Sequence, residues 1–333
     1  MKIAFLFPGQ GTQKIGMGKD LYKKYEEVKK VYKRASEITG IDIATLCFNG
    51  IRQNYTYKEY HEFLDVGDDL IKTENTQIAI ATMSLAILEV LKKNNINADI
   101  AVGLSLGEYT ALIYGGYLIF EDGINLLKNR GYLMQSKLPK GNYSMLAIIG
   151  MESYKVEEIC KRLNDQEMFI TPANYNYCNQ TVVSGEKIAI ENAIKIFKEN
   201  GAKRVVELNT SGPFHTKALE KAKNEYINEL NKVEFREGKV KVIKNIDGNF
   251  YNKKDNINEI LANHIINPVR FDKAIKLMKK EKIDTFIEIG PSKTLSGFVK
   301  RMDFGKNVEI YNINNVETLE QTIHDLKLKK KEG

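Results

Sequence analysis

Short apolar runs and stretches with helical spacing alternate near the two ends of the chain. The apolar runs are closed by turn residues, as Pro8 and Gly9 close the first of them. Such runs are typical of buried strands, whereas apolar side chains at three- and four-residue intervals are typical of helices. The apolar runs span residues 2–7 and 100–104, and two further strand-like segments span residues 240–246 and 285–289. The helix-like stretches span residues 76–93, 108–114, 258–265 and 272–280. This alternation predicts a parallel α/β sheet.

The middle of the chain follows a different order, in which a strand and a helix are followed by two strands, a helix and a last strand. The strand-like runs span residues 144–149, 168–173, 180–184 and 204–208, and the helix-like stretches span residues 153–163 and 189–198. A β-α-β-β-α-β order is typical of ferredoxin-like domains. We therefore predict a large α/β domain made of residues 1–139 and 209–333, with a ferredoxin-like insert at residues 140–208.

The composition is that of a globular protein with a modest positive charge. Apolar residues make up 43% and charged residues 28% of the 333 positions, and both values are near the average of folded domains. Lys and Arg number 50 against 43 Asp and Glu, which gives a net charge of +7. Because this excess is spread along the chain, it is weak evidence for a nucleic-acid partner and suits an acidic protein partner at least as well.

The cysteines and the apolar segments bear on the cellular compartment. A sparse set of cysteines without a C-x-x-C pair argues against a disulfide framework and a zinc site, and it consists of Cys47, Cys160 and Cys178. The apolar run at residues 2–7 is too short for a signal sequence. The longest apolar helical stretch, residues 78–91, is interrupted by polar residues and is shorter than a membrane span. We expect a soluble protein of a reducing, cytoplasmic compartment.

The most distinctive motif is a serine between two glycines. Residues 103–107 read GLSLG, which has the pattern G-x-S-x-G and lies between a predicted strand and a predicted helix. This context is typical of a nucleophile elbow, where the serine sits on a strained turn and the glycines let strand and helix pass close together. Ser105 would then lie at a helix N-terminus, where N–H groups favour developing negative charge. The alternative is an ordinary Gly-rich turn whose serine caps the helix.

A nucleophilic serine needs a base, and the chain has four histidines. They are His61, His215, His264 and His324. His215 ends the segment SGPFH, soon after the last strand of the predicted insert. A histidine on a Gly-Pro loop at a domain junction is well placed for a cleft. A structural histidine with satisfied hydrogen bonds is the alternative.

The segment at residues 8–11 and Arg130 are weaker candidates for a functional site. The segment PGQG at residues 8–11 follows the first strand, and its backbone N–H groups can point into a pocket. The third glycine of a dinucleotide fingerprint and the lysine of a Walker A motif are absent from this segment, so a plain strand-ending turn is the alternative. Arg130 lies on a predicted helix, where an arginine usually faces solvent, and nothing local distinguishes it.

Together these segments resemble one family, the malonyl-CoA:acyl carrier protein transacylases. The resemblance covers nearly the whole chain, in family order and at family spacing. The matching segments are FPGQGTQKIGMG, TENTQIAI, GLSLGEYTAL, NRGYLMQ, ANYNYCNQTVVSG, SGPFHTKAL, INPVRF and EIGPSKTLSGFVKR. The family fold is a hydrolase-like α/β core with a ferredoxin-like insert, which agrees with the prediction from the pattern.

The resemblance implies a role for each candidate. Ser105 is the expected acylated nucleophile and His215 its general base. Arg130 is the expected ligand of the malonyl carboxylate. The backbone N–H groups of Gln10 and Leu106 are the expected oxyanion hole. No metal and no permanently bound cofactor are expected.

The sequence departs from the family pattern at a few places. Leu104 stands where the family usually has a histidine before the serine, so any polar role of that side chain is lost. His264 stands where a glutamine is common, and that position is expected to help orient the catalytic histidine through either its carbonyl or its side chain. Residues 49–69 show no clear period and are predicted to be an irregular excursion, and residues 51–63 within it are longer than in typical members.

The resemblance also implies the reaction and its partners. Malonyl-CoA is the expected substrate and an acidic acyl carrier protein the expected transient partner, with no nucleic acid, no membrane and a monomeric state. Phe214, directly before His215, is expected to favour malonyl over methylmalonyl, because the family associates a bulky aromatic there with the smaller acyl group. One alternative is a serine thioesterase or esterase, which would add a carboxylate to orient the histidine. The other is a non-catalytic scaffold, which an intact Ser105 and His215 disfavour.

Overall fold

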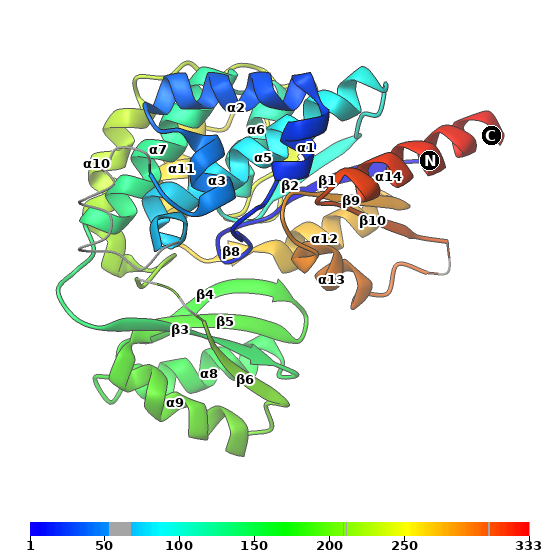
Figure 1. The fold of residues 1–333 in the computed structure, drawn as a ribbon. Coiled ribbons are helices and arrows are strands. Elements are labelled where there is room, and N and C mark those ends of the chain that lie inside the picture. The colour runs from blue at the N-terminus through cyan, green and yellow to red at the C-terminus, as the bar shows by residue number, and fades with distance from the viewer. Residues whose placement is uncertain (53–67, 209, 211, 306, 333) are drawn as a thin grey trace. The chain divides into compact units, whose positions relative to one another are not determined.

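The computed structural model describes residues 1–52, 68–208, 210, 212–305 and 307–332 (Figure 1). Most of the predicted excursion, including His61 and the longer segment at 51–63 from residue 53 onward, lies outside these residues. The chain forms two compact units. The first comprises Met1–Gly131, Glu234–Ile243 and Met278–Gly333, and the second comprises Tyr132–Val233 and Lys244–Leu277.

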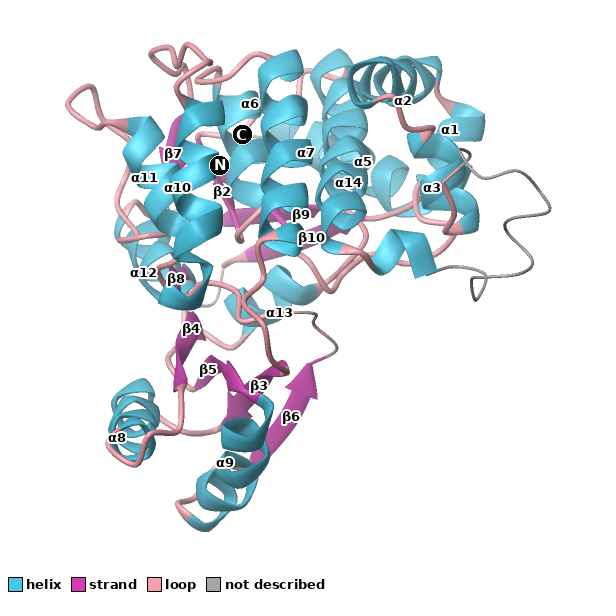
Figure 2. Cartoon of the chain, turned by 90° about the vertical axis from the view of Figure 1, so that its left-hand side faces the viewer, coloured by secondary structure: helices cyan, strands magenta, loops and turns pink. Residues whose placement is uncertain are grey.

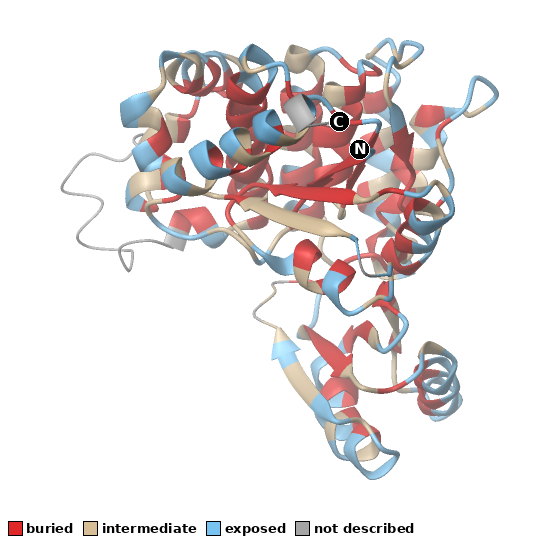
Figure 3. Ribbon diagram, turned by 90° about the vertical axis from the view of Figure 1, so that its right-hand side faces the viewer, coloured by how far each residue is buried: buried red, intermediate tan, exposed pale blue. Residues whose placement is uncertain are grey.

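The first unit is built on a five-stranded sheet in which every pair of neighbouring strands is parallel. Its order is β10 (Glu309–Ile313), β9 (Thr285–Ile289), β1 (Ile3–Phe7), β2 (Ile100–Gly103) and β7 (Lys241–Ile243). Every residue of the three central strands is buried, which explains the continuous apolar runs of β1 and β2 and the largely apolar β9. Figure 3 shows β9 buried beside the half-buried edge strand β10. The predicted parallel α/β core is confirmed.

The helices of the first unit follow from their apolar patterns. Nearly all of α5 (Thr73–Lys93) is buried, because the helix is apolar on most of its circumference. It begins three residues before the predicted stretch, at a polar first turn that the spacing of apolar residues did not include. The other helices are α1 (Lys19–Lys24), α2 (Glu26–Thr39), α3 (Ile43–Asn49), the 3-10 helix η1 (Asp68–Ile71), α6 (Gly107–Gly115), α13 (Thr294–Lys300) and α14 (Val316–Glu332), with α7 (Phe120–Ser136) and α12 (Phe271–Lys280) crossing the boundary between the units.

The second unit carries a five-stranded sheet of mixed direction. Its order is β6 (Arg204–Leu208), β3 (Tyr143–Ile149), β5 (Gln180–Glu186), β4 (Ile170–Tyr177) and β8 (Val269–Arg270). The first four strands pair antiparallel, in the arrangement of a ferredoxin-like sheet. The two helices of the motif, α8 (Ser153–Asn164) and α9 (Lys187–Glu199), lie on one face of the sheet (Figure 2) and bury an apolar core against it. The predicted ferredoxin-like motif is confirmed.

The second unit extends beyond the predicted insert. The short strand β8 pairs with β4 in parallel, although it lies some sixty residues after residue 208 along the chain. Helices α10 (Glu220–Leu230) and α11 (Ile257–His264) also belong to this unit, as does the 3-10 helix η2 (Lys217–Leu219), and the amide of Asn258 donates to the carbonyl of Leu230 at 3.2 Å. The assignment of residues 140–208 to a separate domain stays a prediction.

Candidate active site

Ser105 lies on a turn that only glycine neighbours allow. Strand β2 ends at Gly103 and helix α6 begins at Gly107, with the Ser105 backbone at a φ of 56° between them. A Cβ atom on Gly103 would lie 1.9 Å from the carbonyl carbon of Gly107, and one on Gly107 would lie 2.2 Å from the oxygen of Phe7. Neither clash is with a movable side chain, so both positions require glycine. This is the strand-to-helix geometry of a nucleophile elbow.

Among the described residues, His215 shares with Ser105 a left-handed backbone conformation that no helix end explains. Five non-glycine residues there have positive φ. Three of them lie just after the C-termini of helices, where left-handed residues commonly end a helix, and they are Asn95, Glu167 and Lys282. Ser105 and His215, at 56° and 59°, do not follow a helix end. Residues held in this region cluster at functional sites, and these two are the predicted nucleophile and base.

The loop after β1 packs against the serine turn. Strands β1 and β2 pair in register, with Phe7 opposite Gly103, so the loops that follow them meet at one edge of the sheet. The N–H of Leu104 donates to the carbonyl of Phe7 at 2.9 Å. Within the described residues, the backbone N–H groups of Gln10 and Leu106 donate to no acceptor of the protein. Both are therefore available to an oxygen atom of a ligand.

Arg130 is buried rather than solvated. Its side chain is 1% exposed, and its Nη2 donates to the Ser105 hydroxyl oxygen at 3.2 Å while its Nη1 donates to Oε1 of Gln77 at 2.8 Å. The guanidinium also lies over the ring of Tyr109, at 5.5 Å from its centroid. The alternative of a helix-surface arginine is wrong, because α7 turns this side chain inward toward the serine.

The buried guanidinium has spare donors and no anionic partner. Two of its five N–H donors make the bonds to Gln77 and Ser105, and its Nε has no acceptor among the described residues. No carboxylate of the described part of the chain lies within ion-pair distance of it. A buried charge without a partner is costly. The arrangement therefore suits a ligand that carries a carboxylate next to the Ser105 hydroxyl.

Gln77 is a further candidate site residue, which the sequence reasoning missed. It is 1% exposed and lies on α5, whose first turns carry a run of buried polar side chains in an otherwise apolar helix. The buried polar residues are Thr73, Asn75, Thr76 and Gln77, and the polar segment that they form before an apolar helix was the available signal, because buried polar groups need partners. The side-chain carbonyl oxygen of Gln77 accepts a hydrogen bond from one arm of the Arg130 guanidinium.

His215 belongs to the second unit and is oriented by a backbone carbonyl. Its side chain is 4% exposed, and its Nδ1 lies 2.9 Å from the carbonyl oxygen of His264 at the end of α11. A carbonyl can only accept, so Nδ1 carries the proton and Nε2 is left as the basic nitrogen. Position 264 thus contacts Nδ1 of His215 through its backbone carbonyl, and its role in orienting a catalytic base stays a prediction.

Comparison with known proteins places the chain in a family. A model of the acyl transferase domain matches residues 4–314. The malonyl CoA-acyl carrier protein transacylase of Bacillus subtilis (strain 168) is 36% identical over 326 residues, which cover 98% of each chain. The chain belongs to the malonyl-CoA:acyl carrier protein transacylase family. The resemblance found in the sequence is thereby confirmed, and the protein is an acyltransferase.

Solved structures of transacylases agree with this assignment. The malonyl CoA-acyl carrier protein transacylase of Clostridium perfringens ATCC 13124 is 41% identical, with a TM-score of 0.89 over 99% of this chain and 98% of that chain. A malonyl-transacylase solved in complex with its type II PKS acyl-carrier protein is 30% identical, with a TM-score of 0.87 over 98% of this chain and 100% of that chain. The hydrolase-like core with a ferredoxin-like motif is the fold of these transacylases.

The departures from the transacylase pattern have structural counterparts. The Leu104 side chain packs beside Gly9, since a Cβ on that glycine would lie 2.7 Å from its Cδ2. The ring of His264 lies 4.8 Å from that of His215, centroid to centroid, with the planes 30° apart. Phe214 is 6% exposed. At position 104, the apolar contact of Leu104 with Gly9 thus replaces the polar side chain that the family usually has before the serine.

The two buried cysteines of the described part of the chain are not rival nucleophiles. Burial raises the pKa of the Cys160 thiol to about 12 and that of the Cys47 thiol further, so both stay protonated and are poor nucleophiles. No group of three or more His, Cys, Asp or Glu side chains could hold a metal ion among the described residues. Within those residues, no helix has the length and apolarity needed to cross a bilayer.

Proposed function

We propose that the protein transfers the malonyl group of malonyl-CoA to the phosphopantetheine thiol of acyl carrier protein through a malonyl-serine intermediate. The observation that carries this proposal is the buried Arg130, which lacks an anionic partner among the described residues and lies 3.2 Å from the Ser105 hydroxyl. A malonyl thioester has a carboxylate and a carbonyl carbon separated by one methylene. An arginine fork and a serine side by side match these two groups. The names of the relatives support the same substrate and acceptor.

The first half-reaction forms an ester. The Ser105 oxygen attacks the thioester carbonyl carbon while its proton passes to Nε2 of His215. The negative charge that develops on the carbonyl oxygen is stabilised by the backbone N–H groups of Gln10 and Leu106, each contributing about 3 kcal/mol. The carbon–sulfur bond then breaks, and the CoA sulfur leaves with the proton from His215.

The second half-reaction reverses these steps with a different thiol. The phosphopantetheine thiol of the carrier protein gives its proton to His215 and attacks the ester carbonyl carbon. The carbon–oxygen bond to Ser105 breaks, and the serine oxygen regains the proton. Supply of malonyl groups on a carrier protein serves fatty-acid synthesis.

The arrangement around His215 supports transfer over the esterase alternative. A serine hydrolase of the elbow type orients its histidine with a carboxylate. Here the acceptor at Nδ1 is the neutral carbonyl of His264. The buried Arg130 would also have no purpose in an esterase for uncharged acyl groups.

Direct detection of the intermediate tests the proposal. After incubation with malonyl-CoA alone, intact mass measurement is expected to show one malonyl group on the protein, and peptide mapping should place it on Ser105. Addition of the holo carrier protein should remove the group, and Ser105→Ala should never acquire it. A malonyl group on another residue, or rapid loss of the group to water without the carrier protein, would overturn the proposal.

The expected partner is an acidic acyl carrier protein. The family's carrier protein is acidic, and the net charge of +7 suits an acidic partner by steering its approach. A transient complex, a monomeric transacylase and a cytoplasmic location stay predictions. So does the absence of a nucleic-acid partner.

Selectivity for the acyl group is a separate prediction. Phe214 precedes His215 and is buried, and a packed ring leaves little room for a methyl group on the malonyl methylene. We expect kcat/KM to be higher for malonyl-CoA than for methylmalonyl-CoA by about 10- to 100-fold, since one methyl group in a pocket discriminates by about 1–3 kcal/mol. Phe214→Ala should narrow this ratio. Equal kcat/KM values in the wild-type protein would contradict the prediction.

A further inference from the structure

One hydrogen bond links the loop after β1 to the first residue of α5. The side-chain amide nitrogen of Gln10 donates to the hydroxyl oxygen of Thr73 at 3.1 Å. Thr73 is fully buried and opens the helix. Within residues 9–13 the other hydrogen bonds are internal: the Gly11 N–H donates to the Gln13 side chain, and the Thr12 hydroxyl donates to the Gly9 carbonyl. Among the described residues, the contact with Thr73 is thus the hydrogen bond that ties this loop to another element.

The loop needs such a tie. Gln10 stands between two glycines, and Gly11 has a φ of 92°. Glycine lacks the steric restrictions that hold other residues in one backbone conformation. The Thr12 hydroxyl holds the carbonyl of the Gly9–Gln10 peptide group from within the loop, and the Gln10 side chain holds this internally bonded loop to Thr73 of α5. The direction of the Gln10 N–H relative to the rest of the site therefore depends on the second contact. An oxyanion donor stabilises a transition state only if it already points to where the charge develops.

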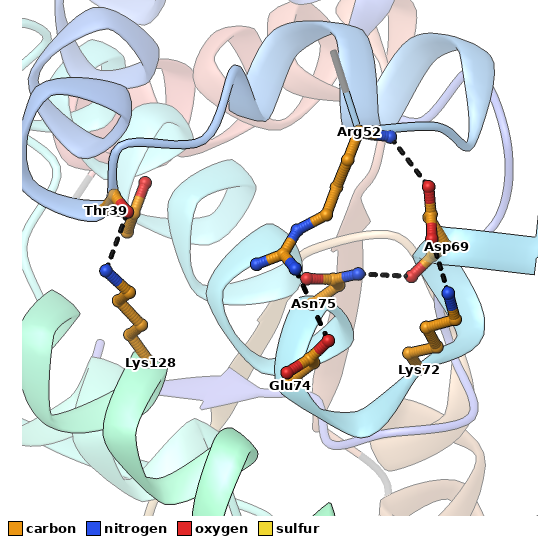
Figure 4. A network of polar contacts seen from close by, with 7 residues as sticks. All are labelled: Thr39, Arg52, Asp69, Lys72, Glu74, Asn75 and Lys128. Atoms are coloured by element: carbon orange, nitrogen blue, oxygen red, sulfur yellow. Dashed lines mark hydrogen bonds and ion pairs between the residues drawn. The ribbon is translucent and has the colours of Figure 1, made fainter. Parts of the chain in front are cut away.

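The first turn of α5 is itself held in place, as Figure 4 shows. Lys72 precedes the helix and provides no side-chain cap. Asp69 holds the first turn through side chains, because its backbone carbonyl accepts from the Asn75 side-chain amide at 2.8 Å and its carboxylate binds the Lys72 ammonium at 2.7 Å. The same carboxylate accepts from the backbone N–H of Arg52 at 2.9 Å. Thr73 therefore lies on a fixed helix end rather than on a frayed one.

We propose that Thr73 is a positioning residue, whose hydroxyl fixes the Gln10 side chain so that the Gln10 backbone N–H stays aimed at the oxyanion. This inference rests on the proposed function. One helix end then sets two parts of the site: Thr73 acts on the oxyanion loop, and Gln77, one turn further along α5, holds Arg130. The two effects can be measured separately. Thr73 would affect only the stabilisation of the oxyanion, which forms in the transition state. Gln77 would affect the binding of the malonyl carboxylate, which is already charged in the ground state.

The test is a set of variants around this hydrogen bond. Thr73→Val removes the acceptor with little change of shape, Thr73→Ser keeps it, and Gln10→Met removes the donor while leaving the backbone N–H. Thr76→Val is the matched control, since Thr76 lies on the same helix as Thr73 but its buried hydroxyl donates to the carbonyl of Leu70 in η1 and not to the loop. The measurements are the single-turnover rate of Ser105 malonylation, the KM for malonyl-CoA, and labelling of Ser105 by a fluorophosphonate, which needs the oxyanion hole but no malonyl carboxylate.

We expect Thr73→Val to lower the malonylation rate by about 10-fold, less than the 10²- to 10³-fold loss for a donor removed outright, with KM changed less than about twofold. Fluorophosphonate labelling should slow equally, and the malonyl-to-acetyl preference should stay at its wild-type value. Thr73→Ser should restore most of the rate. The double variant Gln10→Met/Thr73→Val should be no slower than either single one, because both changes break one interaction.

Several results would overturn the inference. These are a normal rate in Thr73→Val, an equal loss in Thr76→Val, or additive losses in the double variant. A wild-type protein that acquires no malonyl group would instead contradict the proposed function. The fluorophosphonate measurement would still decide the role of Thr73 in that case, since it does not depend on the acyl group.

Discussion

Replacement of Arg130 by alanine is expected to lower kcat/KM for malonyl-CoA by about 10²-fold or more while leaving acetyl transfer unchanged or raised. Each hydrogen bond from the guanidinium to the malonyl carboxylate contributes about 1.5–3 kcal/mol, and two of them account for a loss of this size. Acetyl-CoA lacks the carboxylate and leaves the buried arginine unpaired in the wild-type protein. With acetyl-CoA bound, the wild-type protein therefore keeps an unpaired buried charge, and Arg130→Ala removes this unfavourable free energy. With malonyl-CoA bound, the charge is paired with the carboxylate.

Two companion variants sharpen this experiment. Arg130→Lys should recover only part of the loss, since an ammonium cannot form the planar fork. Gln77→Ala keeps the positive charge but removes the acceptor that lies 2.8 Å from Nη1 of Arg130. Its kcat/KM for malonyl-CoA should therefore lie between those of the wild type and Arg130→Ala. The measurement is kcat/KM for malonyl-CoA and acetyl-CoA in all four proteins. If the malonyl-to-acetyl ratio of Arg130→Ala equals that of the wild type, the arginine does not bind the carboxylate.

Replacement of His215 by alanine is expected to lower malonyl transfer by at least about 10²-fold with substrate binding largely intact, which is the usual scale for a lost general base. The reason lies in the hydrogen bond from Nδ1 to the His264 carbonyl, which leaves Nε2 free of its proton and able to take that of Ser105. The check is the rate of Ser105 malonylation at saturating malonyl-CoA, together with a thermal unfolding curve to confirm folding.

His264→Ala serves as the matched control. It keeps the backbone carbonyl that His215 uses, so we expect a much smaller loss than in His215→Ala. Near-normal transfer by a folded His215→Ala protein would remove this residue from the mechanism and point to His264. An equal loss in both variants would show that the imidazole of His264, rather than its carbonyl, orients the base.

Much of the fold was predictable from local pattern. The buried central strands read as apolar runs because helices cover both faces of a parallel sheet, and the β-α-β-β-α-β order was visible in the spacing. The strands β8 and β10 were missed. The first has only two residues, and the second is a half-buried edge strand, so neither shows an apolar run. The elbow was also predictable, because the close approach of β2 and α6 demands two glycines around the serine within five positions.

The sequence by itself therefore determined the elements, the Ser105 turn and, through resemblance, the family. Only the tertiary structure decided the partners of Arg130 and Gln10, because Gln77 and Thr73 are more than fifty positions away from them along the chain. It also decided what orients His215, since the acceptor is a backbone carbonyl that every residue has and no sequence pattern reveals. The propensity for helix or strand depends on neighbouring residues, so the sequence reveals it. Burial and hydrogen-bond partners depend instead on which distant segments the sheet brings to the same edge.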